Sequence, residues 1–352
     1  MGHLLFVLYI VLGFSTINPE PSKAKVPVSL NLITVISDSE EAFLGRFGGA
    51  TITENGEILY SDKDQKMIHI FHQDGKYHSS FGRQGRGPGE FEVPSAIKTD
   101  DEGYIYIIDN RNARISVWSL DYEYFTDIKM IPGWNIHFKK NARGLYVFNK
   151  PFRRMPSGND TIIISKINRN DRNIEQLYVY EIVDWFDEDR PFSTFSNWVI
   201  TSEDVLIATG HIDQYQLRRI SMYGNIESVF GSSREPIHYT EEEMKIRVEI
   251  ANNISSEAAR IIAQGRTYKH MYSNIEICSQ NWLWVHRNKK FGERDEIDIY
   301  NLDGEYKTMV TIPPSDNELQ MLGIYSDKIL FHITTPIGEE RLYVYQIEYS
   351  GE

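Results

Sequence analysis

An internal repeat of about 47 residues constrains the fold more than any other feature of this sequence. The segment Ala50–Asp62 (ATITENGEILYSD) recurs as Ser95–Asp109 (SAIKTDDEGYIYIID), which places the two final aspartates 47 residues apart. A second hairpin follows each copy, over 67–75 and 113–121. Asp, Asn or Glu before glycine marks the turns, because glycine supplies the positive φ of a tight hairpin. Each unit therefore reads as four short strands with period-2 alternation.

Four weaker copies follow the first two units. They pair 141–148 with 161–165, 202–208 with 215–220, 279–285 with 296–304, and 325–331 with 341–345. With about 40 residues set aside for one insertion, six units have about 48 residues each, which suits the four-stranded blades of a β-propeller. Seven blades would leave about 41 residues each, which is tight for units with long loops. We predict an all-β fold, a six-bladed β-propeller over 28–349, in which Leu30–Ile36 adds a strand to the last blade and hides both sheet edges.

The stretch Phe81–Phe91 (FGRQGRGPGEF), followed by Pro94 and Gly103–Ile115, resembles an NHL repeat. The whole chain resembles the exported bacterial six-bladed β-propeller proteins built from such repeats, most closely over 50–118. The resemblance implies a propeller fold and export, but no particular activity, since that family is largely uncharacterised. It also implies that the glycine-rich loop 82–89 connects two blades. By the same resemblance, a triad of polar residues braces the turn between the second and third strands, namely Asp109, Asn112 and Arg114.

Near the N-terminus, Leu4–Phe14 (LLFVLYIVLGF) is an uninterrupted apolar run of 11 residues. This length is too short for a membrane-spanning helix, which needs about 20 residues, but it suits the apolar region of a signal peptide. We therefore expect a signal peptide over 1–24 and an extracytoplasmic protein, periplasmic or secreted, without a membrane span. The absence of Lys and Arg before the run leaves a buried N-terminal strand or a misassigned start as alternatives.

One helical insertion, at about 235–265, interrupts the strand pattern between blades 4 and 5. Thr240 and Glu243 fit a capping box, and a second short helix is expected over Ser256–Gln264. The insertion should lie on the same face as the loop 82–89. There it would either cover a blade interface or act as a lid over the channel mouth.

Composition excludes several classes of protein. A formal net charge of −13 disfavours nucleic-acid binding, which depends on Lys and Arg neutralising phosphates. The single cysteine, Cys278, rules out a disulfide scaffold and is expected to be buried. His69 and His72 lie three apart on a predicted strand and point to opposite faces, so the two cannot chelate one ion. We expect no metal, no cofactor and a monomeric protein.

Charge is nevertheless distributed unevenly between the two predicted faces. Six loops expected on one face (62–66, 82–89, 109–114, 149–154, 211–213 and 287–290) sum to +8, whereas turns on the opposite face, such as 100–102 and 203–204, are acidic. A channel opening lined by charges of one sign concentrates ligands that carry the opposite charge. The candidate ligand-binding residues are the cations of these loops with one aromatic and one histidine: Arg83, Arg86, Arg111, Phe152, Arg153, Arg154, His211 and Arg287.

The sequence thus predicts an exported binding module for an anionic small molecule, glycan or peptide, or for a partner protein in the cell envelope. The alternative is a metal-dependent lyase or lactonase-like enzyme, since several propellers of this general type hold a metal in the central channel. That alternative requires acids and histidines on the innermost strands facing the axis, and the sequence contains no convincing set.

Overall fold

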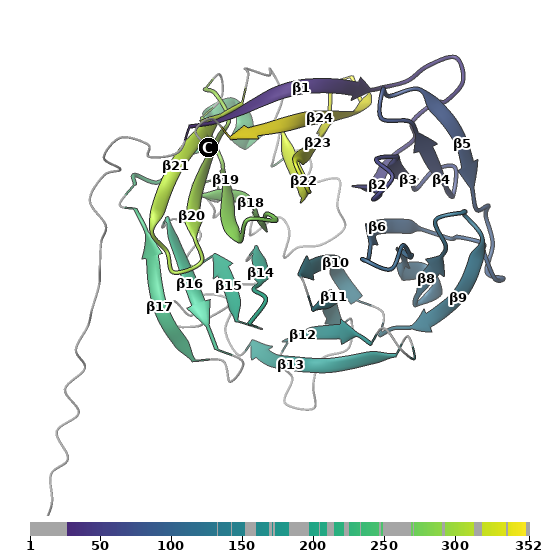
Figure 1. The fold of residues 1–352 in the computed structure, drawn as a ribbon, viewed down its shortest axis with the longest axis horizontal. Coiled ribbons are helices and arrows are strands. Elements are labelled where there is room, and N and C mark those ends of the chain that lie inside the picture. Colours follow the sequence, from purple (N-terminus) through teal and green to yellow (C-terminus); the bar gives the residue numbers. More distant parts are fainter. Residues whose placement is uncertain are drawn as a thin grey trace, which may run out of the picture.

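Six four-stranded antiparallel sheets surround a central axis, so the chain is a six-bladed β-propeller, as predicted (Figure 1). The computed structural model describes residues 27–131, 133–141, 143–151, 160–168, 171, 173–182, 197–203, 205–209, 215–221, 225–232, 234–245, 248, 269, 271–290, 293–312, 319–335 and 337–349. The predicted signal peptide over 1–24 lies outside the described residues.

Each blade runs from an inner strand at the axis to an outer strand at the rim. Blade 1 comprises β2 (Phe47–Ile52), β3 (Ile58–Asp62), β4 (Met67–Phe71) and β5 (Tyr77–Phe81), and blade 2 comprises β6 (Pro94–Thr99), β7 (Ile105–Asp109), β8 (Arg114–Trp118) and β9 (Tyr124–Lys129). Blade 3 comprises β10 (Gly133–Asn141), β11 (Gly144–Pro151), β12 (Asp160–Ile167) and β13 (Ile174–Ile182), and blade 4 comprises β14 (Trp198–Ile200), β15 (Leu206–Thr209), β16 (Gln216–Ile220) and β17 (Ile226–Gly231). Blade 5 comprises β18 (Tyr272–Ile277), β19 (Trp282–Arg287), β20 (Glu296–Asn301) and β21 (Tyr306–Thr311), and blade 6 comprises β22 (Gln320–Tyr325), β23 (Lys328–Thr334), β24 (Glu340–Tyr349) and β1 (Val28–Ile36). A 3-10 turn, η1 (Asn110–Asn112), joins β7 to β8.

The N-terminal strand closes the ring. β1 pairs antiparallel with β24, from Val28 opposite Tyr349 to Ile36 opposite Leu342, and becomes the outer strand of blade 6 (Figure 1, purple beside yellow). This confirms the predicted closure. Because the first and last strands share one sheet, separating the ends of the ring breaks a full strand ladder.

The middle strands of the blades are buried on both faces, whereas the outer strands are more exposed. Every residue of β3, β7 and β8 is buried, but β5 alternates between partly buried and exposed positions, and β9 has one buried residue, Ile128. Packing between neighbouring blades explains the difference. Leu59 and Ile70 of blade 1, for example, lie in one apolar cluster with Ile105 and Trp118 of blade 2. Simple period-2 alternation therefore describes only the strands with a solvent-facing side.

Inner strands carry register shifts near their starts, between Phe47 and Gly49 in β2, Pro94 and Ile97 in β6, and Met321 and Gly323 in β22. Such bulges change the direction of the following side chains. Gly49 lets β2 approach β6 closely, since a Cβ atom there would lie 3.0 Å from the Ala96 Cα. The bulges and this close approach determine which side chains face the axis.

The described part of the insertion lies between β17 and β18, that is, between blades 4 and 5 as predicted. Residues 241–245 are helical. The Thr240 amide donates to Glu243 Oε2 at 2.8 Å and the Glu243 amide donates to Thr240 Oγ1 at 3.2 Å, so the predicted capping box is present. The predicted second helix lies outside the described residues. Among the described segments, no helix is long and apolar enough to cross a membrane.

Candidate ligand-binding channel

Two chambers occupy the axis of the ring, one at each end of the inner strands. The first, of about 530 Å³, is lined where these strands begin, by Phe47, Ser95, Ser273 and Gln320 among others. The second, of about 550 Å³, is lined where they end, by Thr53, Thr99, Ser279 and Tyr325 among others. Both volumes lie within the range of small-molecule sites. Lys98 and Glu276 line both chambers and mark the boundary between them.

The boundary contains a lysine bridge from blade 2 to blade 6. Lys98 of β6 extends along the channel wall past the inner strand of blade 1 and donates from Nζ to Tyr325 Oη at 2.8 Å and to the Leu322 carbonyl at 3.5 Å. Blade 1 separates these two blades in the ring, and its inner strand places Gly48, Gly49 and Ala50 along the first chamber. These small residues leave room for a long side chain to pass.

Gly323 provides the space for the Lys98 ammonium. A Cβ atom at position 323 would lie 2.7 Å from Lys98 Nζ and 2.9 Å from Tyr325 Oη, closer than real Cβ contacts. Burial disfavours the charged form of Lys98, but the Tyr325 oxygen and the more distant Glu276 carboxylate outweigh it, so the pKa of Lys98 lies above its ordinary value. Within the described residues, Lys98 hydrogen-bonds to the Tyr325 hydroxyl oxygen and the Leu322 carbonyl, and not to a carboxylate.

A second lysine bridge joins blade 3 to blade 5. Lys139 of β10 donates from Nζ to Glu276 Oε1 at 2.7 Å and to the Ile275 carbonyl at 3.0 Å. Asn274 Nδ2 donates to the same Glu276 oxygen at 3.3 Å and to the Met321 carbonyl at 2.7 Å. Burial lowers the pKa of Lys139, while the Glu276 carboxylate acts in the opposite direction. This bridge is internally neutralised, unlike that of Lys98.

The two chambers differ in charge, and we name them accordingly. The basic chamber, at the start of the inner strands, is lined among described residues by Lys63, Lys98 and Lys139 against Glu276 alone. The acidic chamber, at their other end, is lined by one more carboxylate than ammonium groups: Lys98, Lys140 and Lys328 against Glu54, Asp101, Glu276 and Asp327. Lys140 is paired with Asp101 at 2.7 Å and Lys328 with Asp327 at 3.3 Å, which leaves little positive field there.

The candidate arginines that the structure describes lie outside both chambers. Arg83 and Arg86 are exposed on the connector between blades 1 and 2, where Arg83 pairs with Glu90 at 2.9 Å and Arg86 approaches Glu92 at 3.8 Å. Arg111 is exposed in η1. Phe152, Arg153, Arg154 and His211 lie outside the described residues.

Arg287, at the end of β19, is buried rather than exposed. It contacts Glu296 and lies 3.5 Å from Asp298 Oδ2, which also accepts a hydrogen bond from the Tyr215 hydroxyl. Burial raises the pKa of Asp298, although Tyr215 and Arg234 oppose the shift. The predicted loop charge of +8 therefore overstates the field of this face, because the fold places carboxylates such as Glu90 and Glu296 beside the counted arginines.

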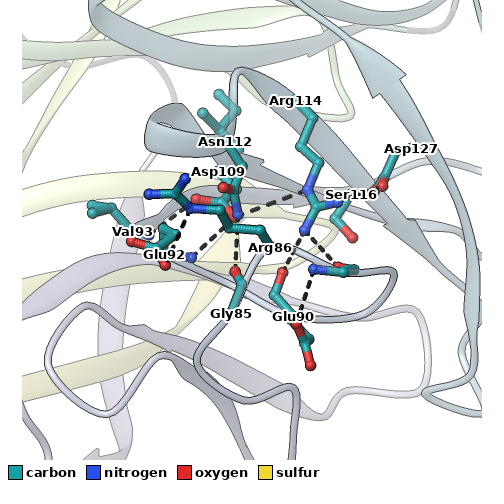
Figure 2. A network of polar contacts seen from close by, with 12 residues as sticks. Gly85, Arg86, Glu90, Glu92, Val93, Asp109, Asn112, Arg114, Ser116 and Asp127 are labelled. Carbon is teal, nitrogen blue, oxygen red and sulfur yellow. Dashed lines mark hydrogen bonds and ion pairs between the residues drawn. The ribbon is translucent and has the colours of Figure 1, made fainter.

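The triad Asp109, Asn112 and Arg114 holds the glycine-rich connector against blade 2 (Figure 2). Asp109 accepts hydrogen bonds from the backbone amides of Glu92 at 3.1 Å and Val93 at 3.0 Å, and from Asn112 Nδ2 at 2.6 Å. Arg114 donates to the Gly87 and Glu90 carbonyls and pairs with Asp127. Asp62 does the same for blade 1 by accepting from the Gly45 amide. The repeated aspartate is thus structural in blades 1 and 2, where it fixes the connector that precedes the inner strand.

Sequence reasoning missed the channel lysines. Lys98 and Lys139 lie within strands, and the candidate residues were taken from loops. The one available signal was a lysine in the middle of an otherwise apolar or small-residue inner strand, PSAIKT in the case of β6. Gly323 carried no readable signal, because its role depends on the approach of a side chain from a blade 225 residues away in the sequence.

Comparison with known proteins supports the architecture. The profile of the DUF5128 family, described as a 6-bladed beta-propeller, matches residues 40–195, which is less than half of the chain. A Bacteroides fragilis protein whose name describes it as exported has 13% identity and a TM-score of 0.56, with 92% of this chain and 95% of that chain covered. A DUF4221 family member from Bacteroides vulgatus has 10% identity and a TM-score of 0.53, with 92% and 99% covered. No protein with a curated description matches the sequence significantly.

A virginiamycin B lyase from Staphylococcus aureus also aligns with the chain, with 14% identity, 93% and 89% of the two chains covered and a TM-score of 0.45. A similarity this weak supports no inference about activity. The NHL character of the repeats stays a prediction.

Proposed function

We propose that this protein is an extracytoplasmic binding protein whose basic chamber takes a small anionic molecule, with Lys98 as the anchoring cation. The observation that carries the proposal is the Lys98 ammonium, held in the channel by Tyr325 and Leu322 oxygens. Such a partly buried cation, whose present acceptors are uncharged, should bind a carboxylate or phosphate oxygen strongly, since charge-assisted hydrogen bonds are about twice as strong as neutral ones.

Three further features favour a small anion over other ligands. The basic chamber holds about 530 Å³, which suits a small molecule rather than a folded partner. Lys63 adds a second cation that forms no ion pair with another described residue, and Phe47 and Phe138 add apolar wall. Among the described residues lining the chambers there is no histidine, so no specific observation favours the metal-dependent enzyme.

The rim arginines have a lesser role in this proposal. Arg83 and Arg86 are exposed and paired with carboxylates of their own connector, so their contribution is limited to long-range attraction of anions, which falls with ionic strength. Arg111 is exposed on the same face and would act in the same way. Arg287, buried against Glu296, is assigned a structural role.

The extracytoplasmic location rests on two supports. The apolar run Leu4–Phe14 has the length of a signal-peptide core, and the propeller fold is shared with a Bacteroides fragilis protein named as exported. Detection of the processed chain in the periplasmic or secreted fraction, with the chain retained in the cytoplasm after Leu8→Arg, would agree with export. Equal distribution of the two forms would contradict it.

The binding proposal is tested with a panel of citrate, galacturonate and inorganic phosphate, matched against neutral galactose. At least one anion should raise the melting temperature of the wild-type chain and bind one to one in calorimetry, and galactose should not. The same anion should lose affinity for the Lys98→Met variant. Equal binding of the anion to wild type and to that variant would refute the basic chamber as the site, and so would an absence of binding by a wider set of carboxylates and phosphate esters.

A further inference from the structure

We propose that Glu57, His72 and His78 form a binding site for a divalent transition-metal ion, of which zinc is the simplest probe, on the outer part of blade 1. One ligand atom from each of the three side chains lies within 4.8 Å of the others. His78 Nδ1 is already 3.2 Å from Glu57 Oε1. Two imidazoles and one carboxylate are a ligand set that Zn²⁺ takes in proteins.

The sheet brings these residues together from three adjacent strands. Glu57 directly precedes β3, His72 directly follows β4, and His78 lies in β5. Ile58 pairs with Phe71 and Phe71 with Tyr77, so each ligand is next to a paired position. Neighbouring strands are about 4.8 Å apart, which accounts for the spacing of the three ligand atoms.

Closing the site requires little movement. Ligands at about 2.0–2.1 Å from a tetrahedral zinc are about 3.4 Å from one another. The imidazole rings of His72 and His78 are stacked with their centroids 4.6 Å apart, and both residues are exposed. Rotation of these two exposed rings about their side-chain torsions is enough to direct one nitrogen of each at a common point. The fourth position then faces solvent and is filled by water.

Tyr122 orients the carboxylate. Its hydroxyl donates to Glu57 Oε2, so the other oxygen, Oε1, is directed to His78. Tyr122 belongs to the turn between β8 and β9 of blade 2, and its ring stacks on Phe81 of blade 1 with the centroids 5.4 Å apart. Outer hydrogen bonds of this kind orient metal ligands and tune their affinity. A bound ion would thereby link the β4–β5 hairpin of blade 1 to blade 2.

The site is separate from the basic chamber. Gly56 and Gln73, the neighbours of Glu57 and His72, line the acidic chamber instead. His69, which the sequence pairs with His72, is buried and lies 3.3 Å from Asp62, so it takes no part. The sequence analysis considered only the His69–His72 pair and did not predict the approach of His78 from across the hairpin.

The test is calorimetric titration of the full chain, produced without a histidine tag, with zinc sulfate in a non-chelating buffer at pH 7.5. We expect one Zn²⁺ per chain and no response to Mg²⁺, since imidazole ligands disfavour magnesium. His72→Ala and His78→Ala should each weaken zinc binding by about 100-fold, and Tyr122→Phe by about tenfold. The matched control is His238→Ala, an exposed histidine outside the cluster, which should leave the affinity unchanged.

A second measurement keeps the proposal falsifiable if a variant folds poorly. X-ray absorption of the zinc-loaded wild-type chain should show two imidazole ligands and oxygen neighbours. Zinc binding that is equally strong in wild type, His72→Ala and His78→Ala would overturn the proposal. So would an absence of zinc binding at millimolar concentration, or a spectrum without imidazole scattering.

Discussion

Replacing Lys98 by methionine removes the channel cation and keeps a side chain of nearly the same length. Lys98 Nζ donates to Tyr325 Oη at 2.8 Å. Of the two other lysines that line the basic chamber among the described residues, Lys139 is paired with Glu276 at 2.7 Å and Lys63 is left as a secondary cation. The variant therefore tests the anchoring role with little change in the shape of the wall.

The expected loss of affinity follows from one charge-assisted hydrogen bond. Such a bond contributes about 1.5–3 kcal/mol, which corresponds to a factor of about 10–150 in Kd. The folded state loses one hydrogen bond to Tyr325, worth about 1 kcal/mol, and no longer buries an ammonium group, so the two effects offset. We expect the melting temperature to change by less than about 3 °C.

The assay is calorimetric titration with the anion that stabilises the wild-type chain, on wild type, Lys98→Met, Lys98→Gln and Lys140→Met. The last is the matched control, because Lys140 lines the acidic chamber and is paired with Asp101. Affinity should fall in the two Lys98 variants and stay within about twofold in Lys140→Met. If the affinity for the anion falls as much in Lys140→Met as in Lys98→Met, the anion does not bind in the basic chamber, and the reasoning is refuted.

Three further predictions concern the scaffold around the site. Gly323→Ala should lower the affinity for the anion about as much as Lys98→Met does, at a nearly unchanged melting temperature, because the added Cβ would displace the flexible Lys98 ammonium. Calorimetric titration and a crystal structure of the variant check this prediction, and a Lys98 ammonium in its original position would contradict it. Asp109→Ala should lower the free energy of unfolding by about 3–5 kcal/mol in urea titrations, since two backbone amides lose their acceptor, whereas Asp121→Ala in an exposed turn should cost less than about 0.5 kcal/mol. Burial lowers the pKa of His332 below its ordinary 6.5, although Glu340 opposes the shift, so the unfolded chain binds more protons and stability falls as the pH drops from 7 to 5. In urea titrations His332→Gln should flatten this slope, and an unchanged slope would assign the effect to other groups.

Much of the ring could be predicted because its determinants are local. The turn glycines, the repeated Asp62 and Asp109, and the capping box of Thr240 with Glu243 act within a few residues of their positions, and each is found where the sequence places it. The closure by β1 was also predictable, since an unpaired strand before the first blade leaves one edge to cover.

The candidate site was less predictable because loop charges were counted without their partners. Arg83 and Arg86 are neutralised by Glu90 and Glu92 of the same connector, which the count over 82–89 left out. Arg287 was assigned to the surface, but the fold buries it against Glu296 of the neighbouring strand in the same blade. A charge in a loop indicates a surface field only once the carboxylates around it are known.

By itself, then, the sequence determined the number of blades, their strand order and the way the ring is closed, since these follow from a repeated local pattern and from the pairing of edges. Only the tertiary structure decided what the channel contains. Lys98 meets Tyr325 and Gly323, and Lys139 meets Glu276, across an intervening blade in each case. The bulges of the inner strands set the direction of these side chains, and the closed ring sets which strands face one another. No single repeat determines these side-chain directions or which strands face one another, because both arise only when the blades are assembled around a common axis.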